Sequence, residues 1–417
     1  MKTLLVIYPH WPPSNLVGVH RVRLLVNEMP AQGWKPIVLT VDPDDYEEPH
    51  AKGSEELVAE GIEVHYVRAR PVLRVLGKRM IGDLGLRAWH ALKQRAHELC
   101  ANGVVDAIWF SLPSWYPCLM GPNLHRRHDI PYAIDYQDPW IQTRTGTGRW
   151  WHRSRWTEFA ARWLEPLALR QVAFLSAINE AYMAGPLEKH HHLRRKPHVA
   201  IQLGYSERDH QISMPDLTSP WDDEERVLLY AGTYWAQGSP LFVEVLMAWK
   251  MAVENGTLPK RSRLVFIGTG HPKLRPLHAR AEAMGIGHLV TEVPERIPFL
   301  HVQELLRRAA ATLVVGSTSK HYSASKVFQL LLAQRPVVAH LHPESEAGQI
   351  LQTCNADAFL SHYDDRDATL RIADLASAIS GALQGPEWAP NLSGLYPFHS
   401  SRACAQLLNA FESSLTS

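Results

Sequence analysis

The residues best suited to chemistry lie in short loops that follow apolar runs and precede helical patterns. The most informative loop contains Tyr322, Ser323 and Ser325, and the helical pattern after it carries Lys326 in its first turn. Serine hydroxyls, free backbone N–H groups and an ammonium at one helix start are well suited to bind a diphosphate. The spacing therefore predicts a phosphate-binding loop at residues 322–326.

Glycines follow three other predicted strands. Gly18 follows the first apolar run, and Gly232 and Gly268 follow two runs in the second half of the chain. A glycine lets the backbone approach a ligand closely, and the N–H groups at a helix start favour an anion. The first loop lacks G-x-G-x-x-G, which argues against hydride transfer with a dinucleotide. A plain turn role for Gly18 stays open.

In the first half, Asp138 is the best candidate for a catalytic group. It follows an apolar run and precedes Pro139 and Trp140, so it could orient or deprotonate an acceptor hydroxyl. The alternative is that Asp135 or Asp138 caps the local turn. Consecutive histidines at 190–192 lack acidic or cysteine partners, so we expect an exposed turn there and no metal site.

Short apolar runs alternate with helical patterns along the chain, which indicates βαβ units and the α/β class. The predicted strands are Thr3–Tyr8, Pro36–Val41, Glu63–Val67, Ala107–Phe110, Tyr132–Asp135, Ala173–Ala177, Arg226–Tyr230, Arg263–Ile267, Leu289–Glu292, Thr312–Val315, Pro336–His340 and Ala358–Leu360. Helices are predicted at Val19–Gln32, Leu76–Ala101, Trp151–Gln171 and Phe398–Ser413.

Two doubly wound domains follow from this series. We expect an N-terminal domain at 1–205, a C-terminal domain at 206–390, and a final helical segment at 391–417 that crosses back to the first domain. Open α/β sheets bind ligands at the carboxyl ends of their strands, so the two domains would face a shared cleft.

Composition narrows the function classes. The 417 residues carry 43 Lys and Arg against 42 Asp and Glu, a balance that argues against a nucleic-acid partner. The four cysteines are far apart in the sequence, which fits a reducing cytoplasm. No apolar run approaches the roughly 18–20 residues needed to cross a bilayer. We expect a cytoplasmic protein that is soluble or peripheral.

The order of these motifs resembles the GT-B glycosyltransferases, specifically the retaining family-4 type. The resemblance spans nearly the whole chain. Its motifs are the Pro-Pro and Gly18 loop, the run Ala133–Trp140, Tyr-Ala-Gly at 230–232, Ile-Gly-Thr-Gly at 267–270, and the Ser-x-Ser-Lys-x-Phe helix that ends in Arg-Pro-Val-Val-Ala at 335–339.

The resemblance implies two Rossmann-like domains and a nucleotide-diphosphate sugar as substrate, with no metal and no other cofactor. In that scheme Gly18 and the loop Ser323–Lys326 hold the donor diphosphate from the two domains. The backbone at Ile297 faces the base, and Gln329 contacts the ribose. The remaining donor-binding candidates are Gly232, Thr233, Tyr234, Gly268, Tyr322 and Ser325.

Several positions depart from the family pattern. Two glutamates seven residues apart are replaced by His321 and Gln329, and the usual Arg and Lys of the Gly232 loop are Thr233 and Gln237. Arg21 and Arg23, with Lys326, are then the nearest cations for the diphosphate. Retention would proceed by front-face attack, in which the departing phosphate accepts the proton of the acceptor hydroxyl.

Two segments combine basic and apolar residues. Residues 68–95 read as a basic amphipathic helix, and residues 144–163 mix five arginines with four tryptophans. Such patterns suit anionic headgroups and the membrane interface, although ordinary solvated helix faces are the alternative.

These features together predict sugar transfer, with retention, to a saccharide or lipid-linked saccharide at the inner face of the cytoplasmic membrane. Bacterial surface-polysaccharide or glycoconjugate assembly is the expected setting. A non-catalytic partner subunit that binds a nucleotide or sugar is the rival, and a nucleotide-sugar epimerase is a third possibility. No motif specifies the base or the sugar of the donor.

Overall fold

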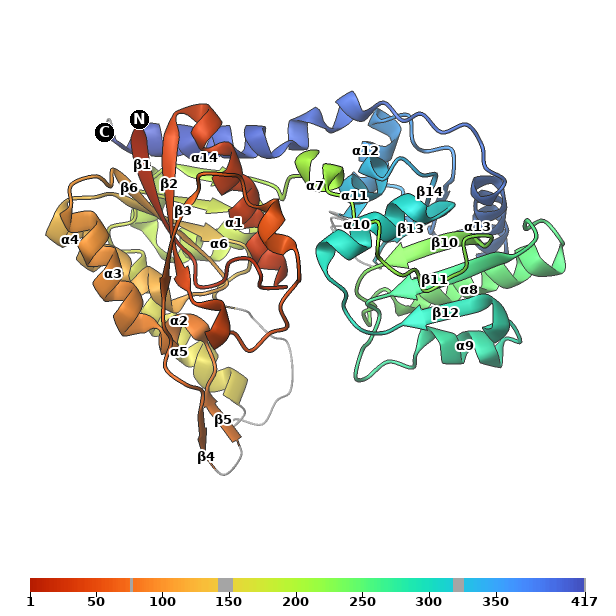
Figure 1. Ribbon diagram of the computed structural model, residues 1–417, viewed down its shortest axis with the longest axis horizontal. Coiled ribbons are helices and arrows are strands. Elements are labelled where there is room, and N and C mark those ends of the chain that lie inside the picture. Colours follow the sequence, from red (N-terminus) through yellow and green to blue (C-terminus); the bar gives the residue numbers. More distant parts are fainter. Residues whose placement is uncertain (76–77, 142–152, 318–325, 416–417) are drawn as a thin grey trace. The chain divides into compact units, whose positions relative to one another are not determined.

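The structure is a computed structural model that describes residues 1–75, 78–141, 153–317 and 326–415; for 75, 78–81 and 153–157 only the backbone is described. The chain divides into two compact units (Figure 1). Unit 1 comprises Met1–Gly204 together with Phe398–Ser417, and unit 2 comprises Tyr205–Pro397. The sequence placed the corresponding boundaries after residues 205 and 390.

The described part of unit 1 contains a seven-stranded, fully parallel sheet in the order β3-β2-β1-β6-β7-β8-β9. The strand order reverses between β1 and β6, where open α/β sheets place their ligands. The strands are β1 (Lys2–Ile7), β2 (Trp34–Val41), β3 (Glu63–Val67), β6 (Ala107–Ser111), β7 (Tyr132–Tyr136), β8 (Phe174–Ala177) and β9 (His198–Ala200).

Helices cover both faces of this sheet. They are α1 (Val17–Glu28), α2 (Leu84–Arg87), α3 (Trp89–Ala101), α4 (Gly121–His128), α5 (Arg153–Ala168), α6 (Glu180–Lys189) and α14 (Ser400–Leu415). Alternate residues of β1 enter opposite cores: Leu5 and Ile7 pack with the α3 side, whereas Leu4 and Val6 pack with α1 and α14. Two-sided burial explains why the strands are continuous apolar runs.

The described part of unit 2 contains a six-stranded parallel sheet in the order β12-β11-β10-β13-β14-β15. Its strands are β10 (Arg226–Ala231), β11 (Ser262–Ile267), β12 (Val290–Val293), β13 (Ala311–Val315), β14 (Val337–Leu341) and β15 (Leu360–His362). Its helices are α7 (Arg208–Gln211), α8 (Ser239–Glu254), α9 (Leu277–Ala283), α10 (Phe299–Arg308), α11 (Lys326–Leu332), α12 (Glu346–Thr353) and α13 (Ala368–Leu383). The two parallel sheets confirm the predicted fold class.

The C-terminal helix α14 belongs to unit 1 and lies along α1 and β8 (Figure 1). The Phe411 ring packs edge-on against Phe174 with centroids 4.7 Å apart, and Phe411 is fully buried. Trp34 Nε1 donates to Glu412 at 3.1 Å, and Ser400 Oγ donates to Glu28 at 2.5 Å. The last segment of the chain thus completes one core of the first unit.

A buried ion pair joins α1 to the sheet of unit 1. Arg21 donates through Nε and Nη2 to the two oxygens of Asp135 at 2.8 and 2.7 Å, and both side chains are at most 1% exposed. Asp135 also accepts from Ser111 and Ser176, and Arg21 donates to the Ile201 carbonyl at 2.6 Å. This network ties α1 to β6, β7, β8 and the chain that follows β9.

The structure corrects the prediction of one basic amphipathic helix through residues 68–95. That stretch holds a short antiparallel hairpin, β4 (Leu73–Val75) and β5 (Lys78–Ile81), followed by α2 and the first half of α3. Asp83 caps α2 by accepting from the Leu86 N–H at 2.8 Å. Arg87 is buried and donates to the Arg70 carbonyl at 2.8 Å, so it is not presented to solvent.

We predict that Asp135→Asn lowers the stability of unit 1 by roughly 3–5 kcal/mol, because the substitution leaves the Arg21 guanidinium buried without its counter-charge. Thermal or urea unfolding measures the effect. Glu98→Gln is the matched control: Glu98 pairs with Arg95 at 2.9 Å on the exposed face of α3, and we expect no measurable loss of stability. Equal losses in both variants would contradict the hub role of Asp135.

Candidate active site

The ends of β10 and β13 in unit 2 bring together Gly232 and Lys326. Gly232 directly follows β10, and Lys326 is the first residue of α11, which comes after β13. A Cβ built on Gly232 would lie 1.8 Å from Lys326 Nζ, and the glycine has a φ of +157°. Only glycine leaves room there for the ammonium, so the predicted close approach at Gly232 is made by a side chain of the protein itself.

The described contacts of the Lys326 ammonium are with aromatic side chains. Its Nζ donates to the Tyr230 hydroxyl at 3.1 Å and lies 5.0 Å from the Tyr230 ring centroid and 5.8 Å from that of Trp235. The Tyr230 hydroxyl in turn donates to the Thr233 carbonyl at 2.8 Å. Within the described residues, no carboxylate contacts Lys326.

Burial, and then the positive charge of Arg296, lowers the pKa of Lys326 to about 8. Arg296 is exposed, lies between β12 and α10, and makes no hydrogen bond to a described residue. Two cations that have no counter-ion among the described residues therefore influence each other at the carboxyl end of this sheet. An anion such as a diphosphate would relieve their repulsion and the desolvation of Lys326. Sequence reasoning missed Arg296, because a lone arginine beside Ile297 carries no spacing signal.

Other predicted donor-side residues lie around the same strand ends. Gly268 follows β11 with a φ of +76°, a left-handed conformation that favours glycine, and its N–H donates to the Val293 carbonyl at 2.8 Å. Ile297 is half-buried in the segment between β12 and α10. Tyr234 differs from its expected role: it is 1% exposed, and its hydroxyl is bonded to Ser239 at 2.7 Å, so its side chain is part of the core.

Gln329 lies one turn after Lys326 on α11. Its Oε1 accepts from His210 Nε2 at 2.7 Å and from Gln303 Nε2 at 2.8 Å, and the buried environment lowers the pKa of His210. The amide nitrogen of Gln329 has no partner within the described residues. Gln329 can therefore donate a hydrogen bond to a ribose oxygen. Its side-chain carbonyl already accepts two hydrogen bonds, so it cannot accept from the ribose hydroxyls as a carboxylate would. The loop residues Tyr322, Ser323 and Ser325 lie outside the described residues, as does His321.

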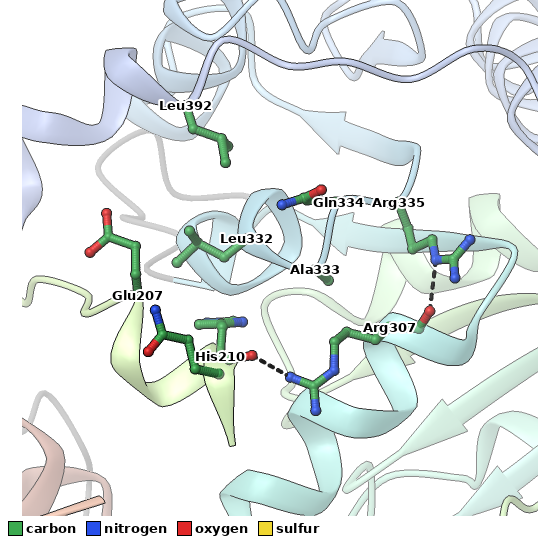
Figure 2. Close-up of a pocket in the computed structure, with 9 residues that line it drawn as sticks. Glu207, His210, Arg307, Leu332, Ala333, Gln334, Arg335 and Leu392 are labelled. Carbon is green, nitrogen blue, oxygen red and sulfur yellow. Dashed lines mark hydrogen bonds between the residues drawn. The ribbon is translucent and has the colours of Figure 1, made fainter. Parts of the chain in front are cut away.

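A pocket of about 590 Å³ lies at the other end of α11 (Figure 2). Its arginines are engaged by backbone carbonyls: Arg307 donates to His210 at 2.8 Å and Arg335 donates to Arg307 at 2.7 Å. The lining residues are Glu207, His210, Gln211, Arg307, Leu332, Ala333, Gln334, Arg335 and Leu392. Because Lys326 and Arg296 are not among them, this pocket is separate from the cationic site.

In unit 1, Gly18 and Asp138 take different roles. A Cβ on Gly18 would lie 2.5 Å from the Tyr8 hydroxyl, and Gln137 donates to the Gly18 carbonyl at 3.2 Å, so α1 packs closely on the end of the sheet. Asp138 follows β7 in an exposed position and has no hydrogen-bond or ion-pair partner among the described residues. Partial desolvation raises its pKa. A capping role for Asp138 finds no hydrogen bond to support it.

The prediction that Arg21 and Arg23 neutralise the diphosphate is wrong, because neither side chain is available to a ligand. Both are 1% exposed; Arg21 is paired with Asp135, and Arg23 donates to the Leu57 carbonyl at 3.2 Å. The amphipathic pattern of α1 could not reveal this, because the acid that pairs with Arg21 lies 114 residues away.

Sequence reasoning also missed a polar cluster beside β1. His10 Nδ1 lies 2.7 Å from Glu48 Oε1, and Ser14 Oγ donates to the same oxygen at 2.6 Å. Burial opposes ionisation of Glu48, but the hydrogen bonds from His10 and Ser14 and the charge of His10 outweigh it and hold the pKa of Glu48 at about 2. His10 and Glu48 lie 38 positions apart in two different loops, so no sequence pattern indicated that they are in contact.

The described residues contain no group of three metal-ligating side chains placed to hold an ion. A search of the same residues for a helix that could span a membrane also found none.

We predict opposite effects of Lys326→Met on stability and on ligand binding. Removal of a poorly solvated ammonium should stabilise unit 2 by roughly 1–2 kcal/mol at pH 7. The folded-state pKa of about 8 lies below the ordinary 10.5, so this difference is full below pH 8 and vanishes as pH rises past 10.5. Affinity for UDP or GDP should fall at least tenfold in the variant, and in the wild type it should weaken as pH rises through 8.

Thermal unfolding from pH 6 to pH 11 and calorimetric titration with each nucleotide make the measurement. The matched control is Lys260→Met, which removes an exposed ammonium from a loop of the same unit. A loss of stability in Lys326→Met, or unchanged nucleotide affinity, would contradict the assignment of Lys326 as an unpaired cation that awaits an anion.

Comparison with known proteins supports the architecture. Residues 18–204 match the family model described as a glycosyl transferase 4-like domain. The match ends at Gly204, after which the chain enters unit 2. A comparison with curated proteins found no match.

Solved structures with similar folds include HepE of Anabaena in complex with UDP-glucose, at 13% identity and a TM-score of 0.56, covering 99% of this chain and 100% of that one. An α,α-trehalose-phosphate synthase (UDP-forming) of Burkholderia xenovorans in complex with glucose-6-phosphate is 12% identical, with a TM-score of 0.58. The match covers 99% of this chain and 100% of that one. UDP-GlcNAc 2-epimerase of Methanocaldococcus jannaschii is 11% identical, with a TM-score of 0.52, and the match covers 99% of each chain.

At such low identities these likenesses show the fold alone. They agree with the family match and with the two parallel sheets, and the resemblance drawn from the sequence motifs is confirmed. The chain has the GT-B fold of these proteins, and its residues 18–204 match the model of a glycosyl transferase 4-like domain.

Proposed function

We propose that this protein transfers a sugar from a nucleotide-diphosphate donor to a saccharide or lipid-linked saccharide acceptor, with retention of configuration. The observation that carries the proposal is the half-buried ammonium of Lys326, which feels the positive charge of Arg296 and has no carboxylate partner among the described residues. A buried cation costs stability unless an anion completes the site. The diphosphate of a nucleotide sugar supplies that anion, and UDP or UDP-glucose is bound in solved structures of the same fold.

Each donor-side residue has a role in this scheme. Lys326 and Arg296 neutralise the diphosphate, and Gly232 leaves space for the lysine. The backbone at Ile297 faces the base, and the amide nitrogen of Gln329 donates to the ribose. No step needs a metal, because the two cations already offset the charge of the leaving group.

Chemistry at the anomeric carbon then follows from position and charge. The acceptor hydroxyl attacks on the face from which the nucleoside diphosphate departs, and a phosphate oxygen of the leaving group takes the hydroxyl proton. Lys326 stabilises the negative charge that develops on the departing diphosphate. Asp138, exposed and without a hydrogen-bond or ion-pair partner among the described residues of unit 1, orients the acceptor.

The rival function is a non-catalytic subunit that binds a nucleotide or sugar. Gln329 and Thr233 favour it, because they stand where family members carry charged groups. Binding without turnover would distinguish this rival from the transferase. An epimerase would convert its donor without an acceptor, so the two enzymes differ in whether an acceptor is required.

We expect UDP or GDP, and the sugar esters of one of them, to raise the melting temperature of the protein, because a ligand that binds only the folded state stabilises it. The screen covers UDP, GDP, UDP-glucose, UDP-galactose, UDP-GlcNAc and GDP-mannose, and release of nucleoside diphosphate is then measured with octyl glycosides as acceptors. Lys326→Met should lose both signals, and Lys260→Met should keep both. A shift without turnover would favour the non-catalytic subunit, and the absence of any shift would remove the donor site.

An exposed apolar row on α5 supports peripheral attachment to a membrane. Phe159, Trp163 and Leu167 are spaced by four residues on one helix face and are 58%, 67% and 44% exposed. The opposite face packs on the sheet, where the Tyr136 hydroxyl donates to Glu165 at 3.1 Å. Arg162 is exposed beside the row, where it donates to Glu158 at 2.7 Å, so an anionic headgroup would compete with this surface ion pair.

Aromatic and leucine side chains next to an arginine suit the interface of an anionic bilayer. Phe159 and Trp163 of this row belong to the predicted membrane segment 144–163, and Leu167 extends it by one turn. Residues 144–152 of that segment lie outside the described residues. We propose that the protein binds anionic lipid through α5 at the inner face of the cytoplasmic membrane, where lipid-linked acceptors would be available.

We predict that Phe159→Ser with Trp163→Ser lowers the affinity for vesicles of phosphatidylglycerol and phosphatidylethanolamine about tenfold or more, because each ring contributes apolar area to the bilayer. Vesicle co-sedimentation measures the partition. Tyr66→Ser is the matched control, since Tyr66 is a comparably exposed aromatic residue on the edge strand β3. Unchanged binding in the double variant would remove α5 as the membrane-binding face.

A further inference from the structure

The cluster of His10, Glu48 and Ser14 lies where an acceptor-binding group of unit 1 would be expected. His10 is the third residue after β1, beside the point where the strand order reverses between β1 and β6. Open parallel sheets bind ligands at this point of the strand order. Glu48 comes from the loop between β2 and β3, so two loops converge on one imidazole.

The hydrogen bonds determine which imidazole nitrogen carries the proton. Glu48 is ionised, so its Oε1 only accepts, and Nδ1 of His10 must donate to it across 2.7 Å. In the neutral ring the lone pair then resides on Nε2. Ser14 donates to the same carboxylate oxygen at 2.6 Å, which holds the acid in place. The imidazole thus presents a hydrogen-bond acceptor of defined orientation.

The rest of the surroundings is aromatic. The His10 ring lies 6.0 Å from Tyr8 and 5.6 Å from Tyr46, whose hydroxyl accepts from the Trp11 N–H and donates to the Val41 carbonyl. These contacts fix the ring, yet the His10 side chain stays 14% exposed. Nε2 has no hydrogen-bond partner among the described residues and reaches solvent.

Tyr8 connects this cluster to Asp138. Burial first, and then the nearby charges of Glu48 and Asp138, among others, raise the pKa of the Tyr8 hydroxyl well above its ordinary value. The carboxylates of both loops are therefore near one buried hydroxyl, which also lies against Gly18. His10 and Asp138 belong to the same strand-end region of unit 1.

We propose that His10 Nε2 accepts a hydrogen bond from the sugar hydroxyl of the acceptor, and that Glu48 and Ser14 position the ring for it. The ligand class is a saccharide with a free hydroxyl. This inference rests on the proposed transferase function and adds the acceptor subsite. In the reaction, the acceptor oxygen forms its bond to the anomeric carbon as the bond to the diphosphate breaks, and the hydroxyl proton leaves with the phosphate while His10 keeps the oxygen aligned.

The test compares three variants with the wild type. His10→Ala removes the acceptor nitrogen, and Glu48→Gln removes the charge that sets the tautomer while it keeps the shape. His50→Ala is the matched control, because the exposed His50 side chain lies near the same Tyr46 ring but, within the described residues, hydrogen-bonds only to the Pro43 carbonyl, and the substitution leaves the backbone bridge of His50 to Ser14 in place.

Transfer from the donor found in the nucleotide screen to octyl glycosides gives the first readout. We expect His10→Ala to lower kcat/KM roughly 10- to 100-fold, chiefly through a higher acceptor KM, with the UDP- or GDP-induced melting shift unchanged. Glu48→Gln should fall between His10→Ala and the wild type, and His50→Ala should match the wild type. Wild-type kcat/KM in His10→Ala would overturn the proposal while the transferase function stands.

Nitrogen NMR of histidine-labelled protein at pH 8 gives a second readout that needs no turnover. The His10 resonances, assigned by their loss in His10→Ala, should show a protonated Nδ1 and an unprotonated Nε2 that shifts on titration with octyl glucoside. A protonated Nε2, or no response to the glycoside, would overturn the acceptor subsite. If no nucleotide sugar binds or reacts, the transferase function fails, and this measurement still decides whether His10 binds a saccharide.

Discussion

The buried pair Arg21–Asp135 is the interaction on which the first unit depends. Its two charges are sealed from water, and each is satisfied by several partners, so α1 can take only one position on the sheet. That position brings Gly18 against the Tyr8 hydroxyl and leaves Asp138, three residues beyond Asp135, at the exposed end of β7. A hydrophobic contact would allow α1 to slide, whereas a bidentate ion pair specifies one register. The polar groups at the strand ends owe their arrangement to this pair.

The second unit is organised around the opposite situation. Lys326 is half-buried against Tyr230 and Gly232 with a second cation nearby, and no described acid compensates it. Evolved sites commonly retain such destabilising charges where a ligand supplies the missing partner. The two units therefore differ in how their enclosed cations are compensated: in unit 1 an internal acid pairs with Arg21, whereas in unit 2 no described acid pairs with Lys326, as expected of the proposed anion site.

Much of the fold could be predicted from the sequence, because strands buried on both faces are short, continuous apolar runs. The predicted Glu63–Val67 coincides with β3, and most other predicted strands overlap the observed ones within one or two residues. The three-residue β9 and the β4–β5 hairpin were not predicted, since so few residues show no periodicity. The helix expected at Leu76–Ala101 was overextended: its basic and apolar residues fit a helical pattern, but the cap at Asp83 and the ties of Arg87 to distant carbonyls decide the local structure.

The candidate site, like the fold, has features that the sequence predicted and features that it did not. The sequence alone determined the fold class, the GT-B resemblance and the placement of Gly232, Lys326 and Asp138 at strand ends, because these follow from local pattern and motif order. Only the tertiary structure decided that Arg21 belongs to the core, that Arg296 joins Lys326, and that Glu48 holds His10. Those outcomes depend on pairs of side chains far apart in the chain, whose proximity is set by sheet order and packing and has no signature in the sequence.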